Sequence, residues 1–285
     1  MRAVAGGPGT FPVVYLRTDV SMPSPVPILL YHSVNADPPS WIAPFSVSPA
    51  TFADHLNEIV SSGRQPLTVS QYVDGLAGRH ALPSRPVLIT VDDGFADFAD
   101  HALPALTERN LPSTLYVTTG ALADRNQDAV LPPAHMLKST DLAGLEAAGV
   151  EIGAHAHSHR QLDLLRPQTV ADEAARSGVI LAEILGHHVR SFAYPHGYWN
   201  RRVRHLIGQA GFDSSCAVGE TFASDRDHHL ALSRLMVRSG TDAATVRAWM
   251  TASAPHVQTH RRRFLAFGWR QFRRVRYRKA ATPWS

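Results

Sequence analysis

Short apolar runs alternate along the chain with longer stretches in which apolar residues recur every three or four positions. The intervening stretches predict helices at residues 51–61, 97–109, 140–148, 169–185, 202–210 and 243–251. The apolar runs are nearly continuous, which is typical of strands covered on both faces. They predict strands at residues 28–31, 87–91, 114–118, 150–154, 191–194, 214–218 and 232–237.

Repeated strand–helix alternation predicts an α/β fold with a parallel sheet, and about seven strands favour a barrel. Functional residues of such barrels gather at the carboxyl ends of the strands. The Gly- and Pro-rich residues 1–24 are expected to be a flexible lead-in, and residues 25–255 one α/β domain. Residues 256–285 then form a basic, aromatic C-terminal tail.

Composition excludes several classes of protein. The single cysteine, Cys216, allows neither an intrachain disulfide nor a thiolate zinc cluster. No run of 18 apolar residues predicts a membrane-spanning helix. Residues 1–15 lack the apolar stretch of a secretory signal, so the chain is expected to be cytoplasmic.

The net charge of +4 hides an asymmetry between the body and the tail. Residues 261–280 contain nine of the 28 basic residues, and residues 256–285 contain no acid. The 19 basic and 24 acidic residues of 1–255 leave that part at −5. Aromatic residues alternate with arginines in 261–280, as in helices that lie on anionic membranes, so we predict peripheral contact with the inner face of a membrane. A solvated tail is nearly as well supported, and nucleic-acid binding is disfavoured because the body is acidic.

Polar residues whose side chains can bind a metal or transfer a proton follow several of the predicted strands. Asp92 and Asp93 directly follow one strand, and paired carboxylates let one bind a metal while the other takes a proton. Taken alone, the Asp-Asp-Gly sequence suits a turn even better. His32 follows the first strand, where a lone histidine is more often structural. The segment Tyr194-Pro195-His196-Gly197 forms a shaped turn that either lines a pocket or only connects two elements.

Three histidines within five residues, His155, His157 and His159, follow another predicted strand. Neutral imidazole is a common Zn²⁺ ligand, and this placement favours a metal site over chance clustering among 16 histidines. On an extended chain all three side chains would share one face, so a 155/157 pair is geometrically allowed.

Together these segments resemble the polysaccharide deacetylases of the NodB-homology type, carbohydrate esterase family 4, in the branch with a Tyr-His-Ser-Val-type first strand. The resemblance spans roughly residues 27–237. It implies a distorted (β/α)₇ barrel with the NodB-like deacetylase fold. It also implies that residues 25–255 are a catalytic domain that removes N-acetyl groups from an N-acetylhexosamine-containing glycan or glycoconjugate.

The resemblance also implies roles for single residues. Asp93, His155 and His159 would bind one divalent metal, usually Zn²⁺, and Asp92 would be the base that activates the metal-bound water. His32 would be the general acid. The oxyanion and substrate pocket would comprise Tyr194, Pro195 and His196, with the backbone N–H of His196 holding the oxyanion. His157 and Arg234 would lie around this centre, with Arg234 a candidate partner of Asp92 by strand order only.

Three positions depart from the family pattern. Ala156 stands where a Ser or Thr usually tethers the loop, Ala193 where an arginine usually pairs with the base, and His196 where an aromatic residue usually follows the proline. None of them removes a ligand or the base, so we predict an active enzyme. The rival hypotheses are an amidase that uses the same metal site on a non-sugar amide, and a catalytically silent sugar-binding protein.

Overall fold

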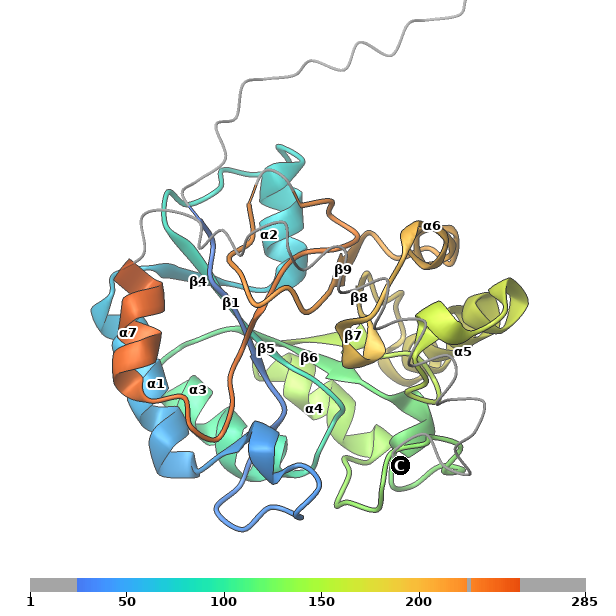
Figure 1. Cartoon of the computed structure of the whole chain (residues 1–285), viewed down its shortest axis with the longest axis horizontal. Coiled ribbons are helices and arrows are strands. Elements are labelled where there is room, and N and C mark those ends of the chain that lie inside the picture. Colours follow the sequence, from blue (N-terminus) through green and yellow to red (C-terminus); the bar gives the residue numbers. More distant parts are fainter. Residues whose placement is uncertain (1–24, 225–226, 252–285) are drawn as a thin grey trace, which may run out of the picture.

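The computed structural model describes residues 25–224 and 227–251, which form a curved parallel sheet with helices around it (Figure 1). Two very short strands, β2 (Ser33–Val34) and β3 (Ser46–Val47), pair separately with each other. The main sheet comprises β1 (Ile28–Tyr31), β4 (Gln65–Leu67), β5 (Pro86–Val91), β6 (Ser113–Val117), β7 (Val150–Ala154), β8 (Ser191–Ala193), β9 (Ser214–Cys216) and β10 (Leu235–Met236).

The strands of the main sheet run in the order β10-β1-β5-β6-β7-β8-β9, and β4 pairs with the start of β5. The sheet curls back on itself, because Leu232, just before β10, forms a parallel bridge with Cys216 at the end of β9. The N–H of Ala217 donates to the Leu232 carbonyl at 2.8 Å, and the Leu232 N–H donates to the Ser215 carbonyl at 2.8 Å. The predicted parallel barrel of seven strands is therefore confirmed, with β4 as an unpredicted addition.

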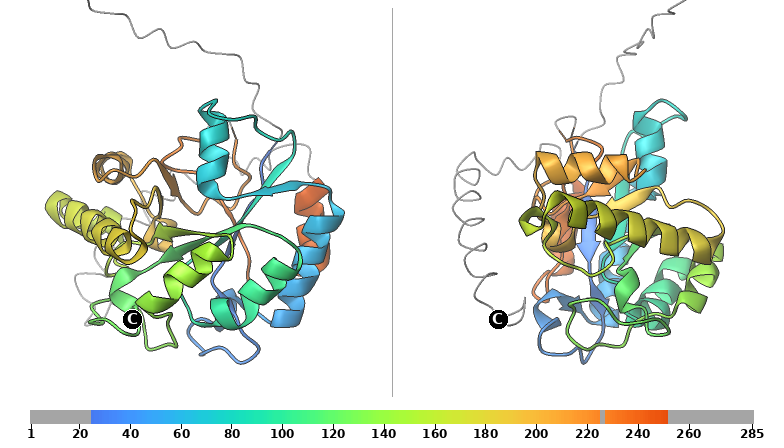
Figure 2. Two further views of the ribbon diagram at one scale, coloured as in Figure 1. Left: turned by 180° about the vertical axis from the view of Figure 1, so that it is seen from behind. Right: turned by 90° about the vertical axis from the view of Figure 1, so that its right-hand side faces the viewer.

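Helices cover the outer face of the sheet. Helices α1 and α7 lie side by side on one flank (Figure 1), and α5 and α6 lie together on another (Figure 2). A π-helical turn, Phe98–Ala102, leads into α3. The helices are α1 (Pro49–Ser61), α2 (Val69–Leu76), α3 (Leu103–Glu108), α4 (Leu142–Ala147), α5 (Pro167–Leu185), α6 (Arg201–Gln209) and α7 (Ala243–Thr251).

Strand alternation divides the core into an outer layer and a barrel interior. Outward side chains such as Leu29, Ile89 and Phe192 pack beneath the surrounding helices. Inward side chains form a second cluster inside the barrel, toward the amino ends of the strands. It includes Ile28, Leu88, Tyr116, Ala193, Cys216 and Leu232, together with Val69, Tyr72 and Val73 of α2.

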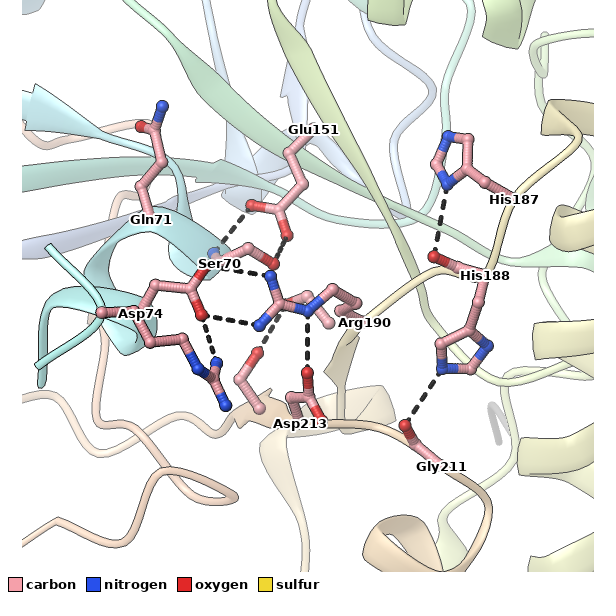
Figure 3. Close-up of polar contacts among 12 residues, drawn as sticks. Ser70, Gln71, Asp74, Glu151, His187, His188, Arg190, Gly211 and Asp213 are labelled. Carbon is pink, nitrogen blue, oxygen red and sulfur yellow. Dashed lines mark hydrogen bonds and ion pairs between the residues drawn. The ribbon is translucent and has the colours of Figure 1, made fainter. Parts of the chain in front are cut away.

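Helix α2 closes the barrel at the amino ends of the strands and is anchored there by polar contacts (Figure 3). Glu151 at the start of β7 accepts hydrogen bonds from the backbone and hydroxyl of Ser70, at 3.1 and 2.5 Å. Further along the helix, Asp74 forms a two-point ion pair with Arg190 at 2.7 and 2.9 Å, and Arg190 also binds Asp213 at 2.7 Å. Because this end is plugged, the opposite end of the barrel is where a substrate can enter.

The predicted lead-in at residues 1–24 and the basic tail at 256–285 lie outside the described residues, so the proposed division of the chain stays a prediction. Helix α2 was not predicted. Within residues 25–224 and 227–251, no helix combines the length and the apolar character needed to cross a membrane.

Candidate metal and catalytic centre

The alternation that fills the barrel with apolar side chains also brings the predicted site residues together. Every second residue of a strand points into the barrel. After the inward Ile28, Leu88 and Leu232, the next inward residues toward the carboxyl ends of the strands are Leu30, Thr90 and Arg234. The inward residues after Leu30 and Thr90 are His32 and Asp92. His155 follows β7 in the same inward phase. The strand geometry therefore gathers His32, Asp92, His155 and Arg234 at the carboxyl end of the barrel, from elements far apart in sequence.

Asp93 reaches this centre through a sharp turn. Its φ of 78° lies in the left-handed region, and Gly94 follows with φ 89°. Asp and Asn tolerate this region better than most residues, although at a cost in backbone strain. The Asp93 carbonyl is held by the N–H of Thr118 at 3.3 Å. The turn therefore directs two successive carboxylates toward one centre instead of opposite faces.

Three buried side chains present ligand atoms to one another. Asp93 Oδ1 lies 3.3 Å from His155 Nε2 and 3.1 Å from His159 Nε2, and the three ligand atoms are all within 4.8 Å of one another. Within the described part of the chain, Asp93 Oδ1 satisfies the geometry of no hydrogen bond. A buried carboxylate oxygen that faces two imidazole nitrogens without bonding to either fits a divalent metal ion, and Asp/His₂ is a usual donor set for Zn²⁺.

The second ring nitrogen of His155 fixes the orientation of its imidazole. Nδ1 donates to the Ala193 carbonyl at 2.9 Å, so the lone pair of the neutral ring lies on Nε2, toward Asp93. Burial alone would lower the pKa of His155, but the charges of Asp92 and Asp93 outweigh it and the pKa is raised. The same two carboxylates hold a cation at this point, whether it is a proton or a metal ion.

The loop that carries His159 is braced from helix α5. Glu173 accepts hydrogen bonds from the backbone N–H groups of His157 and Ser158, at 3.0 and 2.7 Å, and from the Ser158 hydroxyl at 2.5 Å. This brace holds two residues in left-handed conformations, Ala156 (φ 59°) and His159 (φ 61°). The tether that Ala156 cannot supply comes from Glu173 instead, which resolves the expected weakness of the loop.

His157 points away from the three ligand atoms. Its Nδ1 lies 2.9 Å from Thr119 Oγ1, and its Nε2 lies 3.3 Å from Asp128 Oδ2. Both ring nitrogens are therefore engaged at the outer side of the loop. This placement favours the 155/159 pair over the 155/157 pair, because the 156–159 loop is turned and not extended.

Asp92 forms a fully buried two-point ion pair with Arg234. Arg234 Nη1 and Nη2 each lie 2.7 Å from a carboxylate oxygen, and Arg234 Nε donates to the Ala217 carbonyl at 3.1 Å. Burial would raise the pKa of Asp92, but the charges of Arg234 and His155 outweigh burial and hold the pKa below its usual value. Arg234 therefore occupies the role expected of an arginine at position 193, reaching Asp92 from a different strand.

His32 lies at the mouth of the same centre. Its ring packs 5.5 Å from that of Phe45, and its pKa is lowered by burial, an effect that Asp93 and Asp92 partly offset. Among the described residues, His32 Nδ1 has no hydrogen-bond partner. The backbone after His32 is fixed by Asp97, which accepts from Ser33 Oγ at 2.6 Å and from the Val34 N–H at 3.3 Å.

Of the three residues in the turn after β8 that were expected at the centre, His196 lies beside the ligand set and Tyr194 does not. His196 has φ 58° and its ring lies 4.7 Å from that of His159, so it borders the ligand set. Burial, reinforced by the charge of His159, places its pKa well below the usual value. The Tyr194 side chain instead lies in the outer core, where its hydroxyl donates to the Leu230 carbonyl at 2.7 Å. Tyr194 was expected in the pocket, but the strand phase turns its side chain the other way. Pro195, between Tyr194 and His196 in the sequence, is buried.

Comparison with known proteins shows which proteins this chain resembles. A sequence profile described as polysaccharide deacetylase matches residues 79–215, a span that contains Asp92, Asp93, His155 and His159. The Bacillus subtilis (strain 168) protein YxkH, whose name also assigns it to the polysaccharide deacetylases, is 24% identical over 229 residues, covering 80% of this chain and 77% of YxkH. The poly-beta-1,6-N-acetyl-D-glucosamine N-deacetylase of Staphylococcus aureus (strain MRSA252) is 20% identical over 214 residues, which cover 72% of each chain.

Solved structures agree with the fold. The Streptococcus pyogenes deacetylase PplD superposes with a TM-score of 0.72 at 22% identity, covering 81% of this chain and all of PplD. IcaB from Ammonifex degensii superposes with a TM-score of 0.68 at 25% identity, covering 80% of this chain and 98% of that one.

The architecture is thus the distorted (β/α)₇ barrel of the NodB-like deacetylase fold, with an Asp–Asp/His–His centre at the carboxyl ends of its strands. The chain is thus similar to the polysaccharide deacetylases in sequence and in fold, and its class is that of polysaccharide deacetylase-like hydrolases, which act on amide bonds.

Proposed function

We propose that this protein is a metal-dependent deacetylase that hydrolyses N-acetyl groups of an N-acetylhexosamine-containing glycan or glycoconjugate. The observation that supports it most is the buried Asp93 Oδ1 facing two histidine nitrogens, beside a second carboxylate held by an arginine. The name of the S. aureus relative, an N-deacetylase of an N-acetylglucosamine polymer, supports this substrate class.

Asp93, His155 and His159 would hold the ion, and the donor set favours Zn²⁺. A divalent ion in such a site lowers the pKa of bound water and polarises a carbonyl. Asp92 remains ionised at neutral pH beside Arg234, so it can accept the proton of the attacking water. The backbone N–H of His196 would donate to the oxyanion.

His32 would donate a proton to the departing amine nitrogen. Its lowered pKa makes the protonated imidazole a stronger acid, which favours this transfer. Asp97, through Ser33 and Val34, would keep the ring at the mouth of the centre.

Acetate release from N-acetylglucosamine oligomers by the zinc-loaded protein tests the proposal. We expect release by the wild type and a loss of at least a hundredfold in kcat for Asp92→Asn, which is isosteric but cannot accept the proton. Release only from non-sugar N-acetyl amides would favour the amidase hypothesis. Oligomer binding without acetate release from any substrate would favour the silent sugar-binding protein.

The predicted cytoplasmic location and the contact of residues 261–280 with anionic membranes stay part of the proposal. Binding of the full chain to vesicles of phosphatidylserine and phosphatidylcholine tests the contact, with deletion of residues 256–285 as the comparison. Loss of binding on deletion supports it, and equal binding of both proteins contradicts it. Nucleic-acid binding is not proposed.

A further inference from the structure

A pocket lies near the catalytic centre, between the segments that follow β8 and β9. Its volume is about 680 Å³, and its lining includes Trp199, Arg201 and Arg204 on one side and Val218 and Ser233 on the other. Trp199 precedes α6, and the two arginines belong to the first turn of that helix.

This pocket and the catalytic centre share a wall. A methyl group on Gly197 would lie 2.4 Å from Val218 Cβ, so the turn that carries His196 directly contacts the pocket lining. Ser233, also in the lining, directly precedes Arg234, which holds Asp92. A glycan with one residue at the catalytic centre can therefore extend its neighbouring residue into this pocket.

The charge of the lining favours an anion. Among the described residues, the guanidinium groups of Arg201 and Arg204 form no ion pair and no hydrogen bond. Other arginines, by contrast, pair with carboxylates: Arg79, Arg176, Arg190, Arg234, Arg238 and Arg247. Asp227 is the one acid among the described lining residues, and its Oδ2 accepts from the Ser233 N–H at 2.9 Å. Two guanidinium groups thus face one carboxylate, and guanidinium groups match the geometry of carboxylates and phosphates.

Trp199 gives the pocket a flat apolar face. Trp199 is 37% exposed, although tryptophan residues are on average largely buried. The indole stacks on Tyr194, with ring centroids 6.3 Å apart and an interplanar angle of 24°, and the Arg204 guanidinium lies 5.5 Å from its centroid. The ring is therefore held in one orientation. Such a face suits the C–H face of a sugar ring, while the adjacent cations suit a charged substituent.

We propose that this pocket binds an acidic sugar residue next to the N-acetylhexosamine, with Trp199 beneath its ring and Arg201 and Arg204 on its anionic oxygens. The natural substrate is then an acidic glycan, whose charge comes from a carboxylate or a phosphate. This inference rests on the proposed deacetylase function and names the substrate class of that site.

The test uses three N-acetylglucosamine-containing tetrasaccharides: a neutral one, one with alternating glucuronic acid, and one with phosphodiester links. The wild type is compared with the double variant Arg201→Gln/Arg204→Gln and with the control Arg202→Gln. Arg202 belongs to the same helix turn but donates to the Leu165 carbonyl, away from the pocket. Acetate release gives KM and kcat, and calorimetry on the Asp92→Asn background gives Kd.

We expect one acidic tetrasaccharide to show a KM and a Kd at least tenfold below those of the neutral one in the wild type and in Arg202→Gln. The double variant should lose this preference, so that its KM and Kd for the acidic tetrasaccharide approach those for the neutral one. Whichever acidic tetrasaccharide has the lower KM and Kd shows whether the pocket prefers a carboxylate or a phosphate. Equal values for the double variant and the wild type on all three substrates would overturn the inference. If no substrate releases acetate, the proposed function fails, and the Kd values still decide whether the pocket binds an acidic glycan.

Discussion

Replacing Arg234 with methionine would leave Asp92 buried without its counter-charge. The two carboxylate oxygens each lie 2.7 Å from a guanidinium nitrogen, and the side chains are 3% and 0% exposed. With charge centres about 4 Å apart and an effective dielectric constant of about 20, the attraction is about 4 kcal/mol, or about 3 pKa units. Measured effects of such pairs run from about 1 to 3 units. We therefore expect Arg234→Met to raise the pKa of Asp92 by about 1–3 units.

This shift should appear in the pH dependence of activity. Asp92 accepts a proton only when ionised, so the acidic limb of kcat/KM for acetate release should move up by about 1–3 pH units in Arg234→Met. Arg234→Lys keeps the charge without the two-point geometry and should move the limb less. Arg238→Met is the control, because Arg238 follows in the same segment but pairs with Glu220 at the surface. An acidic limb that stays in place in Arg234→Met would refute the role given to Arg234.

The same substitution should lower stability. Removing one partner of a buried ion pair costs about 3–5 kcal/mol in the free energy of unfolding. In the wild type the folded pKa of Asp92 is depressed, so its contribution is present above about pH 4 and is lost as the pH falls through the folded value. The stability difference between wild type and Arg234→Met should therefore be largest near pH 7 and narrow in acid. In urea denaturation, Arg234→Met/Asp92→Asn should be more stable than Arg234→Met alone, since it leaves no unpaired charge.

Three further predictions concern the surroundings of the centre. Glu173→Gln should weaken zinc affinity by about 10–100-fold in a competition titration, because it loosens the loop that carries one ligand. Gly197→Ala should lower the free energy of unfolding by about 2 kcal/mol or more in urea denaturation, because the new methyl group would meet Val218 at 2.4 Å in a left-handed turn. Asp74→Asn should lower stability most near pH 7, and the loss should shrink steadily as the pH falls below about 4, because bonding to Arg190 holds the pKa of Asp74 well below its usual value and the carboxylate contribution fades between the unfolded and folded pKa values.

Matched variants separate these effects from general disruption. Asp172→Asn changes the exposed neighbour of Glu173 on the same helix and should leave zinc affinity unchanged. Gly144→Ala, a helical glycine with nothing within 4 Å of the added methyl group, should be neutral or stabilising. Equal zinc affinity in Glu173→Gln and Asp172→Asn would contradict the bracing role. A stability loss in Asp74→Asn that is as large at pH 2 as at pH 7 would contradict the ion-pair explanation.

The sequence predicted the barrel because buried parallel strands leave nearly continuous apolar runs, and seven of them were visible. Helix α2 was missed although Thr68 and Gln71 form a capping box, a signal that the sequence did contain. Strand β4 could not be predicted in the same way, because Gln65-Pro66-Leu67 has no apolar run and pairs only with the start of β5.

Some residues of the candidate site could be predicted from the local sequence, whereas others depend on contacts between distant segments. Asp92, Asp93, His155 and His159 could be selected because each follows an apolar run, where the strands of a barrel end. Arg234 could be named only by strand order, since nothing local indicates a buried arginine. Glu173 gave no signal, because its spacing on α5 does not distinguish it from the exposed Asp172 until the loop folds against the helix.

The most direct test of the central claim is a titration of metal-stripped protein with Zn²⁺ while acetate release from an N-acetylglucosamine oligomer is measured. We predict that the rate rises with added Zn²⁺ and levels off at about one ion per chain, in the wild type and in His157→Ala. His159→Ala should show no such rise, because it lacks a predicted ligand. Acetate release that is independent of Zn²⁺, or the same titration curve for His159→Ala and the wild type, would contradict the account.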